Sequence, residues 1–339
     1  MKRKLTVALG FISLLLFSVA CSQNAGNGGE IESNSHESEE QVQFSVVSFL
    51  AMDHAFTKDI IPMWMDMIEE ATDGSVTFDW LGGDESVPIT DQFDAVRNGI
   101  VDVGFNVSSY YGHLMPESHS LHISPYTPAE ERDNGYFDYL SERFEGEGFV
   151  YAGRWLSPSP FYFWSNEKIE NLDDLKGLSF RSNPTYHEIL LELGVNPMEI
   201  TPSDVYTSLE RNMVDGFGFP LLGPHRSAWT EVTKYIIDEP FLNQNATILF
   251  NKDAFNEISP ELQEIIFETT VKFEQEMVRY FNDMNDSEWK AIEAAGVERL
   301  TLSSEDSQKF QDTVERVYWD MLEKTSPDQV TTLKKLLTN

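Results

Sequence analysis

Short apolar runs alternate with amphipathic stretches in the chain after residue 41. The runs Phe44–Leu50, Val76–Leu81 and Val101–Asn106 are rich in β-branched and aromatic residues, which is typical of β-strands. Between them, Thr57–Thr72 and Ile89–Asn98 carry apolar residues three and four positions apart, which predicts helices. This order of strands and helices predicts a doubly wound α/β unit with a largely parallel sheet.

The same alternation returns after residue 160 and is followed by long helical stretches. We expect strands at Phe161–Ser165, Leu178–Arg181 and Val214–Phe219, and helices at Leu172–Leu175, Tyr186–Leu193 and Ser203–Asn212. Pro260–Ala295 and Ser304–Lys324 have helical spacing over a much greater length, with Ser259 as a candidate N-cap of the first. The pattern therefore predicts a second α/β unit and two long helices late in the chain.

Two segments of the two units resemble each other. Asp94–Phe105 (DAVRNGIVDVGF) and Ser208–Phe219 (SLERNMVDGFGF) each combine an amphipathic helix, a turn and a strand that begins at Val-Asp. Gly99 and Asn212 stand where each helix ends, and both residue types suit a left-handed backbone conformation. We therefore expect two similarly built lobes, in which the aspartates of the Val-Asp pairs, at positions 102 and 215, cap turns.

The N-terminus has the organisation of a bacterial lipoprotein signal. Three basic residues at positions 2–4 precede Leu5–Ala20, an uncharged run that is too short for a membrane span. Cys21, the only cysteine, follows directly, so we expect residues 1–20 to be a signal peptide and Cys21 to carry the lipid. Simple secretion is the alternative. Residues 21–41 contain almost nothing apolar and are expected to form a disordered tether.

Composition and missing motifs remove several classes of function. The chain has 57 acidic and 24 basic side chains and a formal net charge of −33, which disfavours nucleic acid as a partner. The excess acid fits either a saline habitat or a bias of the lineage. No G-x-S-x-G, H-E-x-x-H, P-loop or G-x-G-x-x-G motif occurs, so we expect no enzyme activity, no cofactor and no metal site. Asn282–Glu288 is interpreted as a solvated helix face.

Five segments together resemble the DctP-type substrate-binding proteins of tripartite ATP-independent periplasmic (TRAP) transporters. The most specific is Asp174–Arg181 (DLKGLSFR), which is similar to a signature segment of that family. The others follow in the family's order, and the resemblance covers Phe44 to the C-terminus. They are Ala71–Gly74 (ATDG), Gly82-Gly83, Ala95–Asp102 (AVRNGIVD) and Asp204–Pro220 (DVYTSLERNMVDGFGFP).

The resemblance implies a two-lobed fold of the periplasmic-binding-protein type. Each lobe would be a doubly wound sheet flanked by helices, and the lobes would close on a ligand. Residues 42–160 plus about 246–287 would form lobe I, and residues 161–245 plus about 288–339 would form lobe II. The implied function is extracytoplasmic capture of a small organic carboxylate, which is then delivered to integral membrane subunits. The protein would be anchored to the outer face of the cell membrane or lie in the periplasm.

Arg181 is the first candidate for ligand binding. It follows a strand that is expected to be buried, and ligands of open α/β sheets bind at the carboxyl ends of strands. A guanidinium can hold a carboxylate through two parallel hydrogen bonds. The sequence on its own favours a structural salt bridge for Arg181. The resemblance reverses this preference, because it implies a role in binding the substrate carboxylate.

The remaining candidates would line the pocket. Phe161 and Phe219 stand where many family members have polar residues, and Trp155 belongs to the same aromatic-rich stretch, which favours a flat apolar or aromatic acid. Packing in the core is the alternative for these rings. Polar side chains that follow the second and third strands of lobe I are expected to reach the cleft, namely Glu85, Asn106, Ser108 and Tyr110.

Two other interpretations of the mature chain stay open at this point. The binding protein of an ATP-driven importer also has two lobes that close on a ligand. The segment Asp174–Arg181 and the long Pro260–Ala295 stretch argue against this alternative. A sensory ligand-binding lipoprotein would present its closed form to a receptor.

Overall fold

The first of two β-sheets is built largely from the N-terminal half of the chain. The computed structural model describes residues 41–54 and 56–338, and the expected signal peptide, Cys21 and nearly all of the tether lie outside them. The strands of this sheet lie in the order β2-β1-β3-β10-β4, where β2 and β3 are parallel to β1, and β10 is antiparallel to both β3 and β4. Their bounds are β1 Val42–Ser48, β2 Val76–Gly82, β3 Val103–Asn106, β4 Phe149–Ser157 and β10 Gln244–Asn251.

The second sheet has the order β11-β9-β5-β8-β6-β7 and repeats this plan. β7 and β8 are parallel to β6, and β5 is antiparallel to both β8 and β9. The bounds are β5 Phe161–Ser165, β6 Ser179–Ser182, β7 Asn196–Glu199, β8 Gly216–Pro220, β9 Tyr235–Ile237 and β11 Glu298–Leu300. The two-lobed α/β fold is confirmed. Each sheet is mixed rather than largely parallel, because β10 in the first sheet and β5 in the second run antiparallel to both of their neighbours.

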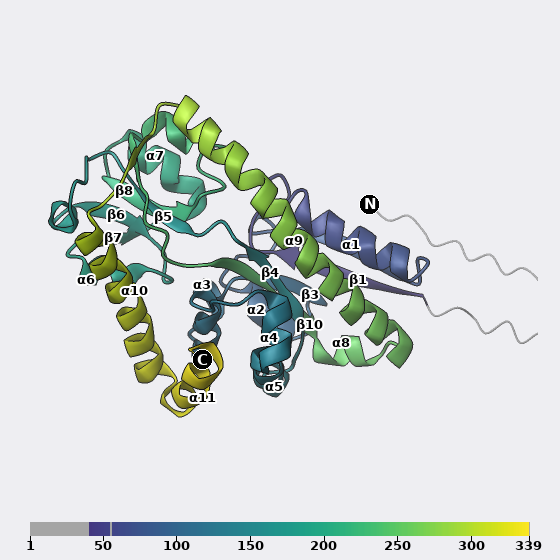
Figure 1. Cartoon of the computed structure of the whole chain (residues 1–339). Helices are drawn as coiled ribbons and strands as arrows, with labels where there is room; N and C mark the ends of the chain where they lie inside the picture. Colours follow the sequence, from purple (N-terminus) through teal and green to yellow (C-terminus); the bar gives the residue numbers. More distant parts are fainter. Residues whose placement is uncertain (1–40, 55, 339) are drawn as a thin grey trace, which may run out of the picture. The chain divides into compact units, whose positions relative to one another are not determined.

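Helices flank both sheets (Figure 1). The α-helices with the first sheet are α1 Ile60–Ala71, α2 Gln92–Arg97, α3 Ser108–Tyr111, α4 Pro128–Asn134, α5 Tyr136–Gly146 and α8 Lys252–Asn256. Those of the second unit are α6 His187–Glu192 and α7 Val205–Glu210. Short 3-10 helices are η1 Pro116–His122, η2 Leu172–Leu175, η3 Pro202–Asp204 and η4 Trp229–Val232. The late helices are α9 Pro260–Ala294, α10 Ser304–Thr325 and α11 Pro327–Leu337.

The long helix α9 connects the two lobes. The Ser259 side chain caps it by accepting a hydrogen bond from the Leu262 amide, and the helix packs against α1 and β4 of the first lobe (Figure 1). At its far end, buried Glu288 pairs with Arg226 of the second unit at 3.5 Å. The expectation that Asn282–Glu288 is a solvated face is therefore wrong for Glu288. It is also wrong for Asn285, whose side chain hydrogen-bonds Ser159.

The last two helices return the chain toward the first lobe. α10 packs against α6 at one side and against η1 at the other, and α11 contacts α5 and η1. Leu333 and Leu337 are buried in the same cluster as Tyr136 and Phe144. The lobe boundaries stay a prediction, but the contacts of α11 depart from a placement of all of 288–339 in lobe II.

The left-handed residues predicted at the helix ends occur in both lobes, whereas the two aspartates bond to a neighbouring strand instead of capping a turn. Gly99 has φ = +67° and Asn212 has φ = +51°, so both adopt the left-handed conformation expected at the ends of α2 and α7. A carboxylate oxygen of Asp102 accepts a hydrogen bond from the Ser45 amide at 2.8 Å. In the second lobe, Asp215 accepts one from the Ser179 amide at 2.8 Å. Each aspartate thus ties the start of one central strand to the neighbouring strand.

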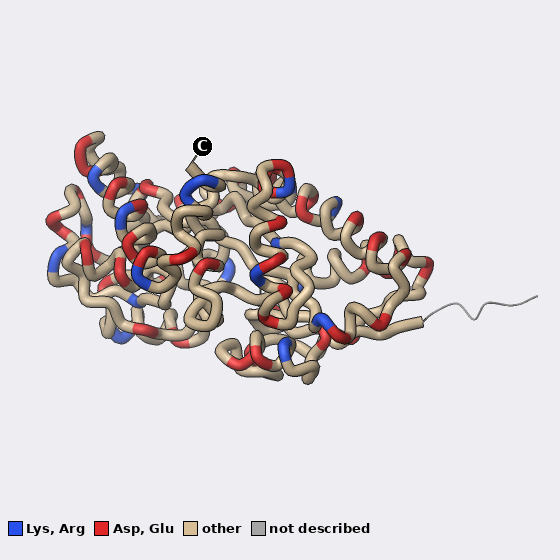
Figure 2. Tube along the Cα trace, turned by 90° about the horizontal axis from the view of Figure 1, so that it is seen from below, with Lys and Arg blue, Asp and Glu red and all other residues tan. Residues whose placement is uncertain are grey.

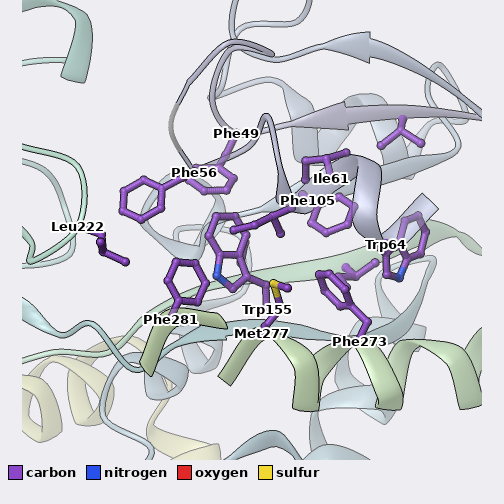
Figure 3. Packing of buried hydrophobic residues seen from close by; sticks show 14 of the residues in the cluster. Phe49, Phe56, Ile61, Trp64, Phe105, Trp155, Leu222, Phe273, Met277 and Phe281 are labelled. Atoms are coloured by element: carbon purple, nitrogen blue, oxygen red, sulfur yellow. The ribbon is translucent and has the colours of Figure 1, made fainter. Parts of the chain in front are cut away.

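The largest hydrophobic cluster lies between α9, α1 and the first sheet. Figure 3 shows Trp155 of β4 between Phe49 on one side and Phe281 of α9 on the other. The Trp155 and Phe281 rings stack with centroids 5.7 Å apart and planes 2° apart. Leu222 of the second lobe joins the same cluster, so apolar packing continues across the lobes.

Acidic residues occur along the whole described trace rather than in one segment (Figure 2). This distribution fits a chain that carries 57 acidic residues.

Candidate ligand-binding site

A small cavity lies where the carboxyl ends of the central strands of both lobes meet. Phe49 and Val107 directly follow β1 and β3, while β6 and β8 carry Arg181 and Phe219 at their own carboxyl ends. Crevices of this kind are where open α/β sheets bind ligands. The cavity has a volume of about 50 Å³. Its lining residues are Phe49, Leu50, Ile89, Val107, Ser109, Tyr110, His122, Phe161, Arg181, Asn183, Pro202, Phe219, Pro220, Gln244 and Asn245.

Arg181 is the one cationic side chain among these lining residues, and it is only 1% exposed. Its Nε donates to the Ile200 carbonyl at 2.8 Å, and its Nη1 donates to the Tyr186 hydroxyl at 2.7 Å and to the Gly218 carbonyl at 3.3 Å. These neutral acceptors orient the guanidinium without neutralising its charge. In the part of the chain that the structure describes, no carboxylate oxygen lies within 4.0 Å of Arg181. A buried cation without an ionic partner is costly, and a bound anion would remove that cost.

Tyr110 lies in the electrostatic range of Arg181. Burial raises the pKa of the Tyr110 phenol, while the Arg181 charge lowers it by less, so the phenol is neutral at neutral pH. A neutral phenol can donate a hydrogen bond to an anion held by Arg181.

Phe161 and Phe219 form apolar walls beside the guanidinium. Both rings are buried, and the Arg181 guanidinium carbon lies 6.0 Å from the Phe219 ring centroid. Phe219 also faces Phe56 of the first lobe, with centroids 6.4 Å apart. These walls exclude water, which strengthens the attraction between the guanidinium and an anion.

Four of the predicted site residues do not line the cavity. Trp155 lies in the core. Asn106 is buried, and its amide nitrogen lies 3.5 Å from Gln92 Oε1. The Ser108 hydroxyl lies 2.8 Å from His122 Nε2. Glu85 is exposed and accepts hydrogen bonds from the amides of Gly83 and Met52. Ligand contact by these four stays a prediction, whereas Arg181, Tyr110, Phe161 and Phe219 share one cavity.

Several lining residues were not predicted from the sequence. Ser109 lies shortly after β3, and His122 is the last residue of η1. Asn183 directly follows β6. Gln244 and Asn245 open β10, where the chain returns to the first sheet. The sequence offered no local signal for Gln244 and Asn245, because their place beside Arg181 depends on the return of β10 to the first sheet.

Larger hollows lie elsewhere in the described residues and have different linings. One of about 340 Å³ includes Arg316 and Lys324, but Arg316 is half-exposed and already pairs with Glu192. Two others have greater volumes. One of about 640 Å³ is lined by residues of the lobe crossings and of α10, and one of about 630 Å³ lies between α3, η1 and α10. Neither lining contains Arg181 or another lysine or arginine. Their volume reflects open grooves, so the small cavity around the buried cation is the better candidate. Within residues 41–54 and 56–338, no cluster of three or more His, Cys, Asp or Glu side chains could hold a metal ion.

Two similar lobes, crossing segments and a cavity shared by both lobes define a two-lobed solute-binding protein. The model of the DctP family, described as bacterial extracellular solute-binding protein family 7, matches residues 47–325. The chain belongs to this family. The match favours a TRAP-type system over the ATP-driven importer that the sequence left open.

Relatives of known structure or function agree with this assignment. The 2,3-diketo-L-gulonate-binding periplasmic protein YiaO of Escherichia coli (strain K12) is 25% identical over 284 residues, which are 79% of this chain and 84% of the relative. A TRAP periplasmic solute-binding protein of Desulfovibrio salexigens, solved with bound orotic acid, has a TM-score of 0.78 and 21% identity over 87% of this chain and 97% of its own. DctP7 of Bordetella pertussis, an extracytoplasmic solute receptor binding pyroglutamic acid, has a TM-score of 0.78 and 16% identity over 88% of this chain and 100% of its own. The two structures are similar in fold.

Proposed function

We propose that this protein captures a small organic carboxylate outside the cytoplasm and delivers it to the membrane subunits of a TRAP-type importer. The observation that carries the proposal is Arg181, a buried guanidinium that lines the cavity and has no ionic partner within the described residues. The solutes named for the relatives above are organic acids, which supports an acid as the ligand here.

Closure of the lobes would supply selectivity. The cavity takes lining residues from both sheets, so a ligand that contacts both stabilises the closed form over the open one. Among the helices that the structure describes, none is both long and apolar enough to cross a membrane. In our proposal the separate membrane subunits provide the passage.

Replacement of Arg181 tests the proposed function. We expect Arg181→Ala to weaken carboxylate binding by ~2–5 kcal/mol, which is at least about 30-fold in Kd, because the anion loses its charged partner. The measurement is a thermal-shift screen on purified full-length protein stripped of ligand, followed by calorimetry. The panel holds short dicarboxylates, 2-oxo acids, sugar acids and aromatic acids, each with its neutral amide.

A second arginine provides the matched control. Arg316 lies on the surface and pairs with Glu192, so Arg316→Ala should leave binding unchanged. Carboxylates that bind Arg181→Ala as tightly as the unchanged protein would refute the assignment of Arg181. Hits confined to neutral compounds would refute organic acids as the ligand class.

We further propose that Cys21 carries a lipid that holds the protein on the outer face of the membrane. The support is the position of the only cysteine directly after a basic segment and a short apolar run. In cells, the unchanged protein is expected in the membrane fraction and labelled by radioactive palmitate. Cys21→Ser should abolish the label and move the protein to the soluble extracytoplasmic fraction. An unlabelled, soluble unchanged protein would support simple secretion instead.

A further inference from the structure

Two amide side chains at the start of β10 are buried against the cavity without hydrogen-bond partners. Asn245 is 2% exposed, and within the described residues both its Nδ2 and its Oδ1 lack a partner. Gln244 is 7% exposed, and its Oε1 also lacks one. Both residues line the same cavity as Arg181. Because a buried polar group without a partner is strongly destabilising, such groups in native proteins are usually completed by a ligand or by water.

The neighbouring polar residues differ from this pair. The Asn243 amide donates to the Ser124 carbonyl at 2.6 Å, and the Thr247 hydroxyl donates to the Asn106 carbonyl at 3.0 Å. The orphaned atoms of this segment are therefore found at the two positions that face the cavity. This correspondence indicates that the missing partners come from the cavity itself.

The charges of the lining limit what the partner can be. Arg181 is the one cation among the lining residues, and these residues include no Asp or Glu. One bound carboxylate neutralises Arg181. A second carboxylate could accept a hydrogen bond from the Asn245 amide nitrogen, but it would face two amide oxygens and no second cation, so its charge would be buried without an ionic partner.

We propose that Gln244 and Asn245 bind a neutral group of the ligand that both donates and accepts hydrogen bonds, such as an amide or a hydroxyl. The ligand is then a monocarboxylate that carries this second group, and dicarboxylates are rejected. The inference rests on the proposed function, because it assumes that Arg181 holds the carboxylate.

The position of the two anchors gives the neutral group a further role. Arg181 belongs to β6 of the second sheet, whereas Gln244 and Asn245 belong to β10 of the first. A ligand that reaches both anchors joins the two lobes. An acid without the neutral group contacts Arg181 alone and stabilises the closed form less.

A series of acids of nearly equal shape tests the inference on the unchanged full-length protein. Succinamate, 4-oxopentanoate, 4-methylpentanoate and succinate differ only in the group opposite the carboxylate, which is an amide, a ketone, an isopropyl group and a second carboxylate. 3-Carbamoylbenzoate, 3-acetylbenzoate, 3-isopropylbenzoate and isophthalate repeat the comparison on a flat ring. By calorimetry, we expect each amide to bind about 10- to 100-fold tighter than its apolar analogue, the ketone to lie between them, and the dicarboxylate to bind weakest.

Two asparagine variants separate recognition from structural support. Asn245→Leu should reduce the preference for the amide over the apolar analogue to within about threefold, without lowering the melting temperature of the ligand-free protein, because it removes a buried group that has no partner. Asn243→Leu is the matched control. It removes a satisfied amide outside the cavity lining, so it should lower the melting temperature and keep the preference.

The outcomes separate this inference from the proposed function. Acids that bind through Arg181 with equal affinity for amide, apolar and carboxylate groups would overturn the inference alone. A preference that survives Asn245→Leu would also overturn it. If no member of either series binds while other acids of the wider panel bind through Arg181, the inference fails alone. If binding of carboxylates does not depend on Arg181, the proposed function fails together with the inference.

Discussion

At the scale of single residues, His122 connects the cavity to the crossing between the lobes. Its Nδ1 lies 2.9 Å from the Asn243 carbonyl and its Nε2 lies 2.8 Å from the Ser108 hydroxyl. A neutral ring protonated on Nδ1 satisfies both contacts, because Nδ1–H donates to the carbonyl and Nε2 accepts from the hydroxyl. The pKa of His122 is lowered to about 4, chiefly by burial. The hydrogen bond to Asn243 raises the pKa in part, and the nearby Arg154 charge lowers it.

This lowered pKa predicts loss of stability in acid. A histidine that is neutral in the folded state and has an ordinary pKa of about 6.5 when unfolded stabilises the fold fully above pH 6.5. That contribution is lost as the pH falls from 6.5 toward 4, and it amounts to roughly 3 kcal/mol at most. We therefore expect the melting temperature of the ligand-free protein to fall across this range.

Histidine variants assign the pH dependence. His122→Gln should melt with a smaller decrease between pH 7.5 and 4.5 than the unchanged protein, while exposed His113→Gln should keep the full decrease. The pKa values of His54 and His119 are also lowered, mainly by burial, so some decrease will remain in His122→Gln. Identical profiles of His122→Gln and the unchanged protein would show that His122 does not titrate in this range.

At the scale of elements, the two lobes repeat one unit whose central strands could be predicted from the sequence. The positions of α1, β2, β5 and α9 agree with the expected ranges to within a few residues, because apolar spacing in these segments is regular over their full length. The left-handed residues Gly99 and Asn212 were predicted because a helix end is a local feature. The hydrogen bonds of Asp102 and Asp215 to neighbouring strands were not predicted, because those strands are distant in the sequence.

Elements that depend on distant partners were not predicted. β7, β9 and β11 are only three or four residues long, and they exist as strands because a neighbour pairs with them. The same limit applies to the site. Arg181 could be proposed from its segment, but Asn245 joins Arg181 only through the return of β10 to the first sheet, which no local pattern encodes.

At the scale of the whole described chain, contacts between the lobes decide how easily the cavity opens. The Ser109 hydroxyl on α3 hydrogen-bonds the Thr185 hydroxyl, which precedes α6 in the second lobe. The Thr185 carbonyl accepts a hydrogen bond from the Tyr318 hydroxyl of α10 at 2.7 Å. Thr185 does not line the cavity, so its side chain can be changed without removing a ligand contact.

Loss of this contact should favour the open form. We expect Thr185→Val to weaken ligand binding by about 0.5–1.5 kcal/mol, roughly 2- to 10-fold in Kd, because less of the protein occupies the closed form. Small-angle scattering of the ligand-free variant should show a larger radius of gyration than that of the unchanged protein. The melting temperature should change little, since the cores of both lobes are intact.

Tyr318→Phe provides the comparison for this prediction. It removes a hydrogen bond to the same residue but on the side away from α3, inside the hydrophobic cluster of the second lobe. It should therefore lower the melting temperature and leave the radius of gyration unchanged. If Thr185→Val binds ligand with unchanged affinity and scatters like the unchanged protein, the hydroxyl pair does not control closure. Other contacts between the lobes, such as the apolar packing of Phe56 against Phe219, would then set the opening equilibrium.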